Sequence, residues 1–267
     1  MPTSTLSINE DEKKLIVSAY RRLLRSLKSK ANKEDKKNIR VAYEMAVEAH
    51  SQQRRKSGEP YILHPIEVAR ICVQEIGLGP TAVICALLHD VVEDTPVTLE
   101  EIHQKFGEKI TMIVDGLTKL DGLYSGENPQ AENFRKVVST LVKDVRVVLI
   151  KMADRLHNLR TIGSMPRHKQ LKIAAETSYI YGPLAHRLGL YNVKTEYQDL
   201  CMKITEPDTY FEIAKKLKET KIGRDKYIRE FIKPLKKSLS ELKVEYRING
   251  RPKSISSIWN KICLLYT

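Results

Sequence analysis

Apolar residues recur at every third or fourth position along most of the chain, which is the spacing of amphipathic helices. Short polar breaks separate these periodic stretches and predict where one helix ends and the next begins. The expected helices cover residues 10–29, 36–52, 65–77, 81–94, 99–106, 108–119, 131–143, 145–163, 167–188, 190–203, 207–219 and 223–243. The fold class that this pattern predicts is all-α.

Local signals refine several of these boundaries. Thr98 and Glu101 have the spacing of a capping box, and Gly107 is suited to the other end of the same helix. Residues 145–150 are rich in β-branched side chains, but a helical period continues through them to residue 162 and favours one long helix. Residues 121–130 are rich in turn-forming residues and predict a loop.

Only the end of the chain departs from the helical pattern. Residues 244–248 alternate between apolar and polar side chains, as in a strand. We therefore expect a short strand-forming remnant at the C-terminus of an otherwise helical fold.

The composition excludes two broad classes of protein. The chain of 267 residues has no run of 18 apolar residues, and its N-terminus lacks the apolar core of a signal peptide. Its four cysteines are widely spaced and form no CxxC pair, which favours reduced thiols over a zinc site or a disulfide framework. The expected location is the cytoplasm, with no membrane partner.

The formal net charge of +13 favours an anionic partner. Residues 201–267 contribute much of it, with 12 Lys and 4 Arg against 8 acidic residues. A nucleotide, a nucleic acid or an acidic protein surface would suit this segment, but so would a set of solvated helix faces.

The densest group of reactive side chains follows the apolar run 82–88. On one continuous helix, His89 and Glu93 would lie four residues apart, as would Asp90 and Asp94. A charged end on a buried helix needs neutralisation, which a divalent cation would supply. The next turn would then hold carboxylates that handle a water molecule, and Pro96 would end the helix. This stretch predicts the floor of a metal-dependent hydrolase site.

A metal centre on a helical scaffold takes its ligands from several segments. The candidates are His64, His89, Asp90 and Asp154. Such a mixed nitrogen and oxygen set suits manganese or iron better than structural zinc. A histidine before proline, such as His64, is more often a cap or a packing residue, and Asp154 would also be explained by pairing with Arg155 or Arg160.

Four segments carry a more specific resemblance: residues 55–65, 87–95, 153–158 and 181–189. In this order they resemble the hydrolase domain of the RelA/SpoT homologue family, whose members make and destroy the alarmone (p)ppGpp in the bacterial stringent response. The candidate ligands also resemble the pattern of the wider HD superfamily of metal-dependent phosphohydrolases. The likeness covers roughly residues 36–262 and implies a multi-helix bundle of the HD superfamily.

The resemblance implies a role for each candidate residue. The four ligands His64, His89, Asp90 and Asp154 would bind one Mn²⁺. Glu93 and Asp94 would be catalytic and would position or deprotonate the attacking water. Five residues would bind the substrate: Arg55, Lys56 and Ser57 at the pyrophosphate, and Asn158 and Thr161 at the nucleoside. Spacing, and not the resemblance, places His157 on the face of Asp154; a structural role is the simpler interpretation, and support of a ligand is the alternative.

The implied reaction is attack of water on the phosphorus attached to the ribose 3′ oxygen, with release of pyrophosphate and formation of GDP or GTP. The partner would be this small molecule, and neither nucleic acid nor the ribosome is expected to bind. Two alternatives remain open at this point. They are an HD-fold hydrolase of another nucleotide and a non-catalytic regulatory module of helices.

The same resemblance divides the chain into three parts. Residues 1–200 would form the hydrolase domain, 201–244 a helical linker, and 245–267 the truncated start of a synthetase domain. Residues 250–261 resemble the opening of that synthetase domain, whose remaining elements have no counterpart here. Synthetase activity is therefore not expected from this chain.

Overall fold

Helices dominate the structure, a computed structural model that describes residues 9–27, 30–121, 144–242, 245–248, 250 and 252–266. Within these ranges no strand forms, and the β pairing recorded is one isolated bridge between Arg54 and Pro60. The predicted all-α class is confirmed. The helix expected over 131–143, and almost all of the loop expected over 121–130, lie outside the described residues.

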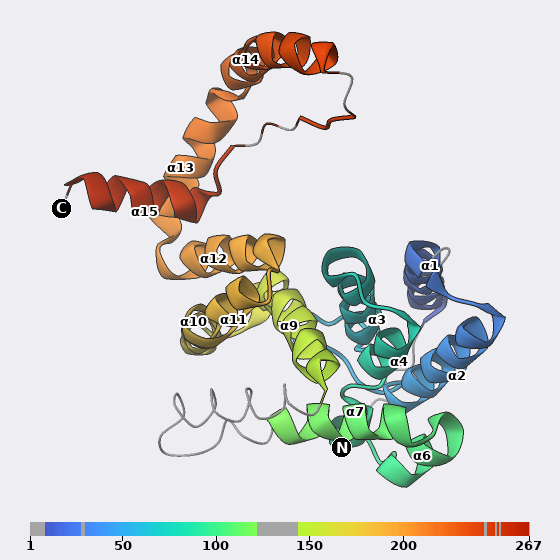
Figure 1. Cartoon of the computed structure of the whole chain (residues 1–267). Helices are drawn as coiled ribbons and strands as arrows, with labels where there is room; N and C mark the ends of the chain where they lie inside the picture. Colours follow the sequence, from blue (N-terminus) through green and yellow to red (C-terminus); the bar gives the residue numbers. More distant parts are fainter. Residues whose placement is uncertain are drawn as a thin grey trace. The chain divides into compact units, whose positions relative to one another are not determined.

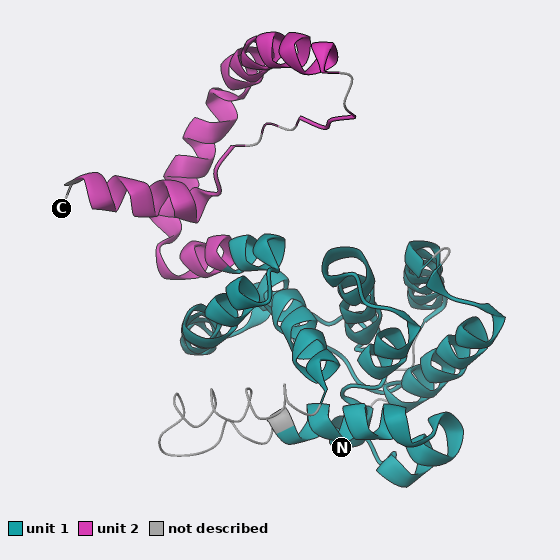
Figure 2. Ribbon diagram, viewed as in Figure 1, with its two compact units in different colours: residues 1–197 teal, residues 198–267 magenta. Residues whose placement is uncertain are grey.

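The chain divides into two compact units, Met1–Tyr197 and Gln198–Thr267 (Figure 2). The first unit contains α1 (Glu10–Leu27), α2 (Lys33–Ala49), α3 (Leu63–Ile71), η2 (Cys72–Ile76), α4 (Pro80–Leu87), α5 (Val91–Asp94), α6 (Leu99–Phe106), α7 (Glu108–Asp121), α9 (Val145–Arg160), η4 (Ile162–Ser164), α10 (Arg167–Glu176), η5 (Thr177–Tyr181) and α11 (Gly182–Arg187). Helix α12 (Tyr191–Thr205) spans the division. It is followed in the second unit by α13 (Pro207–Glu219), α14 (Lys221–Glu241) and α15 (Ile255–Tyr266) (Figure 1).

The core of the first unit forms where α3, α4 and α9 pack together. Helix α4 is almost entirely apolar, and each residue from Ala82 to Leu87 is buried. Helix α3 also packs against α1, α2 packs against α4, and α7 packs against both α6 and α9. The site residues described below lie on or beside the three central helices, so the rigid core positions them.

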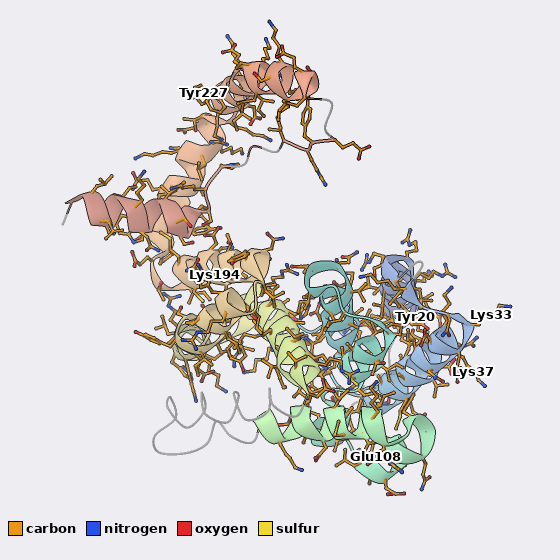
Figure 3. The ribbon with its side chains drawn as sticks, in the orientation of Figure 1. Tyr20, Lys33, Lys37, Glu108, Lys194 and Tyr227 are labelled. Atoms are coloured by element: carbon orange, nitrogen blue, oxygen red, sulfur yellow. The ribbon has the colours of Figure 1, made fainter. Side chains whose placement is uncertain are left out.

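Charged side chains lie on the outer faces of the helices. Lys33 and Lys37 on α2 extend away from the first unit (Figure 3). Helix α14 has 21 residues, several of which are lysines, and none of its residues is buried. Part of the positive charge therefore sits on solvated helix faces.

None of the described helices has the length and hydropathy needed to cross a membrane.

Two expected helix ends are confirmed in detail. The Thr98 hydroxyl accepts from the backbone N–H of Glu101, the Glu101 carboxylate accepts from the N–H of Thr98, and α6 ends at Gly107. The helix expected over 145–163 forms as α9 followed by the short 3₁₀ turn η4. Its N-terminus is capped by Asp144, whose carboxylate accepts from the N–H of Arg146 at 2.9 Å.

Replacing Asp144 with alanine is expected to lower the free energy of unfolding by about 1 kcal/mol, because α9 loses its N-terminal cap. Urea denaturation followed by circular dichroism measures this change. Asp144→Asn keeps a capping oxygen and should lose less. An equal loss in the two variants would instead assign the effect to the ion pair of Asp144 with Arg146.

The prediction of a single helix over 81–94 is wrong, because α4 ends at Leu87 and a separate short helix, α5, begins at Val91. The reason is a side-chain hydrogen bond. His89 Nδ1 lies 2.8 Å from the carbonyl oxygen of Ala86, which in an uninterrupted helix would accept from the N–H of Asp90. His89 and Asp90 therefore occupy a turn between two helices.

The strand expected over 244–248 is also wrong for the residues that the structure describes. Residues 245–248 form neither helix nor strand. A strand needs backbone hydrogen bonds from a neighbouring strand, and no described segment pairs with this one. The chain instead continues into α15. The three functional parts expected at 1–200, 201–244 and 245–267 stay predictions.

The four cysteines differ in their burial. Cys72, Cys85 and Cys201 are buried, and Cys263 is half-buried. Burial raises the pKa of Cys85 to about 12, so this thiol stays protonated and packs as an apolar side chain.

Candidate functional site

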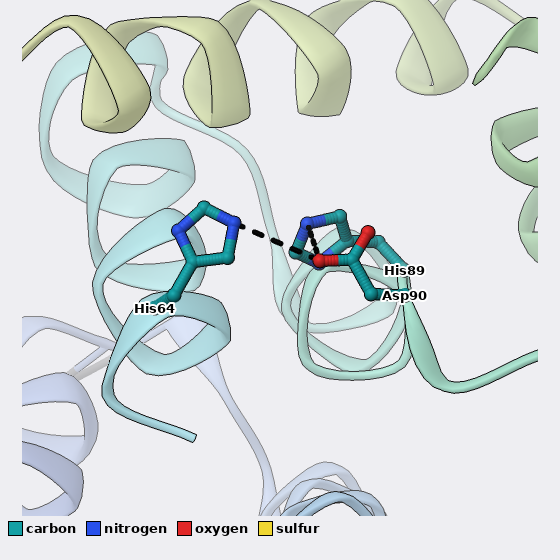
Figure 4. A group of neighbouring side chains, drawn as sticks. All are labelled: His64, His89 and Asp90. Carbon is teal, nitrogen blue, oxygen red and sulfur yellow. Dashed lines mark ion pairs between the residues drawn. The ribbon is translucent and has the colours of Figure 1, made fainter. Parts of the chain in front are cut away.

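Three parts of the core bring the four candidate ligands together. His64 lies in the first turn of α3, His89 and Asp90 lie in the turn between α4 and α5, and Asp154 lies in α9. His64, His89 and Asp90 each offer a ligand atom within 4.8 Å of the other two (Figure 4). Asp154 joins them, because its Oδ1 lies 3.1 Å from His64 Nε2 and 3.9 Å from His89 Nε2.

The cluster is buried and its two carboxylates favour positive charge. His64 is 3% exposed, His89 is fully buried and Asp90 is 9% exposed. Burial alone would lower the pKa of His89, but the charge of Asp90, with Asp154 behind it, raises it to about 9. Burial would raise the pKa of Asp90, but His89 outweighs it and lowers that pKa. A divalent cation would satisfy both carboxylates and displace the imidazole proton.

The hydrogen bond of His89 to the Ala86 carbonyl also orients its ring for metal binding. A carbonyl oxygen only accepts, so the Nδ1 of His89 carries a hydrogen and Nε2 is the atom left to bind a cation. This Nε2 is buried and has no hydrogen-bond partner among the described residues, although it lies 3.0 Å from Asp90 Oδ2. A buried ring nitrogen directed at two carboxylates fits a cation site.

Asp154 does not pair with the two arginines that offered another explanation for it. Arg155 pairs with Glu176 at 3.2 Å, and Arg160 contacts Glu196 at 2.6 Å and Glu75 at 2.9 Å. The cation beside Asp154 is Lys151, whose Nζ lies 3.7 Å from its Oδ2. Its other oxygen, Oδ1, is the one that faces His64.

Arg55 reaches the same cluster from the loop between α2 and α3. Gly58 in this loop has a φ of 91°, a conformation that glycine adopts without strain, and its N–H donates to the Arg55 carbonyl. The Arg55 guanidinium donates to Asn158 Oδ1 at 2.9 Å and to Thr161 Oγ1 at 3.2 Å. Three of the five expected substrate-binding residues therefore meet beside the candidate ligands. The other two, Lys56 and Ser57, are exposed in the same loop.

The model of a protein family described as HD domain matches residues 42–191, which include all four candidate ligands. The chain belongs to the HD domain family. An HD domain implies a bound divalent metal, and the buried cluster of His64, His89 and Asp90 could hold one.

Relatives support the more specific resemblance to RelA/SpoT homologues. The chain is 43% identical over 230 residues to the bifunctional (p)ppGpp synthase/hydrolase SpoT of Escherichia coli strain K12, covering 85% of this chain and 33% of that protein. It is 42% identical over 241 residues to a GTP pyrophosphokinase of Streptomyces coelicolor, covering 90% of this chain and 28% of that protein. The chain thus spans about a third of the length of these relatives.

A solved structure is similar in fold as well. It is that of a metazoan ortholog of SpoT, described as hydrolysing ppGpp and acting in starvation responses. The match has a TM-score of 0.51 and 27% identity, and it covers 63% of this chain and 96% of that one. The resemblance to this family is therefore confirmed by sequence and by structure.

The two expected catalytic carboxylates of the HD domain lie on α5, immediately after the ligand turn. Glu93 and Asp94 are both exposed, so a water molecule or a substrate can reach them. Partial desolvation of its carboxylate and the charge of Asp90 raise the pKa of Asp94.

Tyr61 is a residue of the HD centre to which the sequence pattern assigned no role. Its hydroxyl donates to Asp90 Oδ2 at 2.6 Å and lies 3.4 Å from Asp94 Oδ2. Burial and the charge of Asp90 raise the pKa of Tyr61, so the hydroxyl stays protonated and remains a donor. The signal available in the sequence was its position three residues before His64.

We expect Tyr61→Phe to weaken divalent-cation binding by about tenfold, because Asp90 loses the donor that orients its carboxylate. Competition with a fluorescent chelator gives the dissociation constant of Mn²⁺. Tyr179→Phe is the matched control, since Tyr179 is 71% exposed. Equal affinities in Tyr61→Phe and the control would show that Asp90 is oriented by other groups.

Proposed function

We propose that this chain hydrolyses the 3′-pyrophosphate of ppGpp and pppGpp in a metal-dependent reaction, giving GDP or GTP and pyrophosphate. One observation carries the proposal: Arg55 is held by hydrogen bonds beside a buried His and Asp cluster. A site for a divalent cation therefore adjoins a guanidinium whose positive charge can attract a phosphate. The names of the relatives and of the structural neighbour support the choice of substrate.

The proposed metal is Mn²⁺. Two imidazoles and two carboxylates form a mixed nitrogen and oxygen set, which supports manganese over structural zinc. His64, His89, Asp90 and Asp154 would hold the ion. When bound, it would act as a Lewis acid on a phosphate oxygen.

The remaining residues bind, orient and move protons. Glu93 and Asp94 would hold the attacking water and accept its proton, with Tyr61 linking Asp94 to Asp90. The water oxygen bonds to the phosphorus while the bond from phosphorus to the ribose 3′ oxygen breaks. The proton that the carboxylates accepted would pass to that ribose oxygen, which becomes a free hydroxyl, and the water oxygen leaves as part of pyrophosphate.

Substrate binding would combine charge with a shaped pocket. Arg55 and Lys56 would contact the pyrophosphate, with Ser57 nearby in the same loop. Asn158 and Thr161 would line the nucleoside pocket. Both already accept a hydrogen bond from Arg55, so the guanidinium would join the two halves of the substrate site.

The extent of this function along the chain is also a proposal. Residues 1–200 would form the hydrolase domain, 201–244 a linker and 245–267 the start of a synthetase domain. The cytoplasmic location and the absence of synthetase activity stay predictions. That the partner is a small molecule and not a nucleic acid is a prediction as well.

The test is to incubate the purified chain with ppGpp and Mn²⁺ and to separate the products by ion-exchange chromatography. We expect GDP and pyrophosphate in equal amounts, and no products when EDTA removes the metal. Cleavage of other nucleotides but not of ppGpp would overturn the substrate assignment and leave only HD chemistry. Absence of cleavage of any nucleotide, with Mn²⁺ bound, would favour a binding module.

A further inference from the structure

A chain of hydrogen bonds connects Arg55 to the candidate ligand His64 through His157. Arg55 Nη1 lies 3.2 Å from His157 Nδ1, and the same Nδ1 lies 2.8 Å from His64 Nδ1. The two imidazole rings are 4.8 Å apart between centroids. One ring nitrogen of His157 thus faces both a guanidinium and a ring nitrogen of His64.

The identities of donor and acceptor follow from the chemistry of arginine. A guanidinium only donates hydrogen bonds, so His157 Nδ1 must accept and carries no hydrogen. The remaining contact of this atom is with His64, and it can form only if His64 Nδ1 is the donor. The hydrogen of the neutral His64 ring is therefore on Nδ1, which leaves a lone pair on Nε2.

That lone pair lies where a cation is needed. His64 Nε2 is 3.1 Å from Asp154 Oδ1 and 3.7 Å from Asp90 Oδ2. Two acceptor atoms at 3.1 Å repel each other unless a positive charge lies close to both. The tautomer imposed through His157 is thus the one in which His64 can serve as a ligand.

A second connection runs in parallel. Arg55 Nη2 donates to Asn158 Oδ1, and Asn158 Nδ2 donates to Asp154 Oδ1 at 2.7 Å. Arg55 therefore reaches a ligand on α3 and a ligand on α9 through two neighbouring side chains. Because its own side chain is only 10% exposed, the guanidinium is held in this position by the protein.

We propose that His157 is a positioning residue that imposes the ligand tautomer of His64 and through which Arg55 sets the affinity of the cation site. Without Arg55, His157 could take its other tautomer, donate to His64 and place the His64 hydrogen on Nε2. The coupling is reciprocal, so an occupied cation site would also hold Arg55 ready for a phosphate. The inference rests on the cation site of the proposed function but not on its substrate.

The first test measures Mn²⁺ affinity without any nucleotide, by chelator competition. His157→Leu should weaken binding by about 10-fold to 100-fold. His157→Asn places an amide oxygen near the position of Nδ1, can accept the same bonds, and should stay within about threefold of the unaltered chain. His103→Asn is the matched control, because His103 is exposed on α6. An equal loss for Leu and Asn at position 157 would overturn the proposal.

The second test reads the tautomer directly, by NMR of the protein with ¹⁵N-labelled histidine in the absence of metal. His64 should show a hydrogen on Nδ1 in the unaltered chain and in His157→Asn, and a mixture of tautomers in Arg55→Met. Arg55→Met does not change any residue of α9, where His157 lies. It therefore tests the connection from Arg55 to His64 even if His157→Leu does not fold. An unchanged His64 tautomer and unchanged Mn²⁺ affinity in Arg55→Met would overturn the role of Arg55.

These readouts separate the inference from the proposed function. If ppGpp is not cleaved but the His157 variants alter Mn²⁺ affinity and the His64 tautomer as expected, the substrate assignment fails and the positioning role stands. If ppGpp is cleaved while the variants alter neither property, the positioning role fails and the hydrolase assignment stands.

Discussion

Asp90→Asn is expected to lower the rate of pyrophosphate release from ppGpp by about a thousandfold and to weaken Mn²⁺ binding at the same time. Asp90 Oδ2 lies 3.0 Å from His89 Nε2 and 3.7 Å from His64 Nε2, and it accepts from the Tyr61 hydroxyl. Asparagine has the same size but no charge, and its amide nitrogen cannot bind a cation. The loss should therefore come from the missing metal.

Two measurements check this result. Product formation at saturating ppGpp gives the rate, and chelator competition gives the Mn²⁺ dissociation constant. Asp11→Asn on α1 is the control, because its side chain is 92% exposed. An Asp90→Asn variant that binds Mn²⁺ as tightly as the unaltered chain would remove Asp90 from the ligand set.

Asp94→Asn has the second largest expected effect, a fall in kcat of about 100-fold or more with little change in Mn²⁺ affinity. Asp94 lies on α5, outside the ligand cluster, and contacts it through the Tyr61 hydroxyl at 3.4 Å. Its amide counterpart keeps this contact but cannot take a proton from water. The variant should therefore bind metal and substrate and fail in the proton transfer.

Glu93→Gln compares the two carboxylates, and Glu100→Gln on the exposed face of α6 is the control. Single-turnover kinetics with Mn²⁺ and ppGpp gives the rate of the chemical step. A larger loss for Glu93→Gln would transfer the role of base to Glu93. A loss of Mn²⁺ affinity in Asp94→Asn would contradict the division between metal-binding and proton-accepting residues.

Part of the site follows from short-range patterns and part does not. The density of charge directly after the apolar run 82–88 indicates a neutralising cation, and His89 and Asp90 do lie in the buried cluster. No spacing rule connects them with His64 or Asp154, because these residues meet only through the packing of α3, α4 and α9. Their assignment depended on resemblance, and as ligands they stay predictions.

The helices themselves were predictable because an amphipathic period repeats along the chain. The break after Leu87 was not, since residues 88–90 contain neither glycine nor proline. The His89 side chain hydrogen-bonds to the carbonyl of Ala86, which would otherwise accept the next backbone hydrogen bond of the helix. The π-helical turns at Cys72–Ile76 and Thr177–Tyr181 were missed for a similar reason, because a local register change leaves the apolar spacing almost unaltered.

The assembly of one cluster from three distant stretches has a consequence for folding kinetics. His64, His89 and Asp154 can meet only after long intervening segments have been ordered, and contacts between positions far apart in sequence form slowly. Isolated helices would form early without any affinity for the ion. Cation uptake during refolding should therefore be a late event, and its rate would report when α3, α4 and α9 complete their docking.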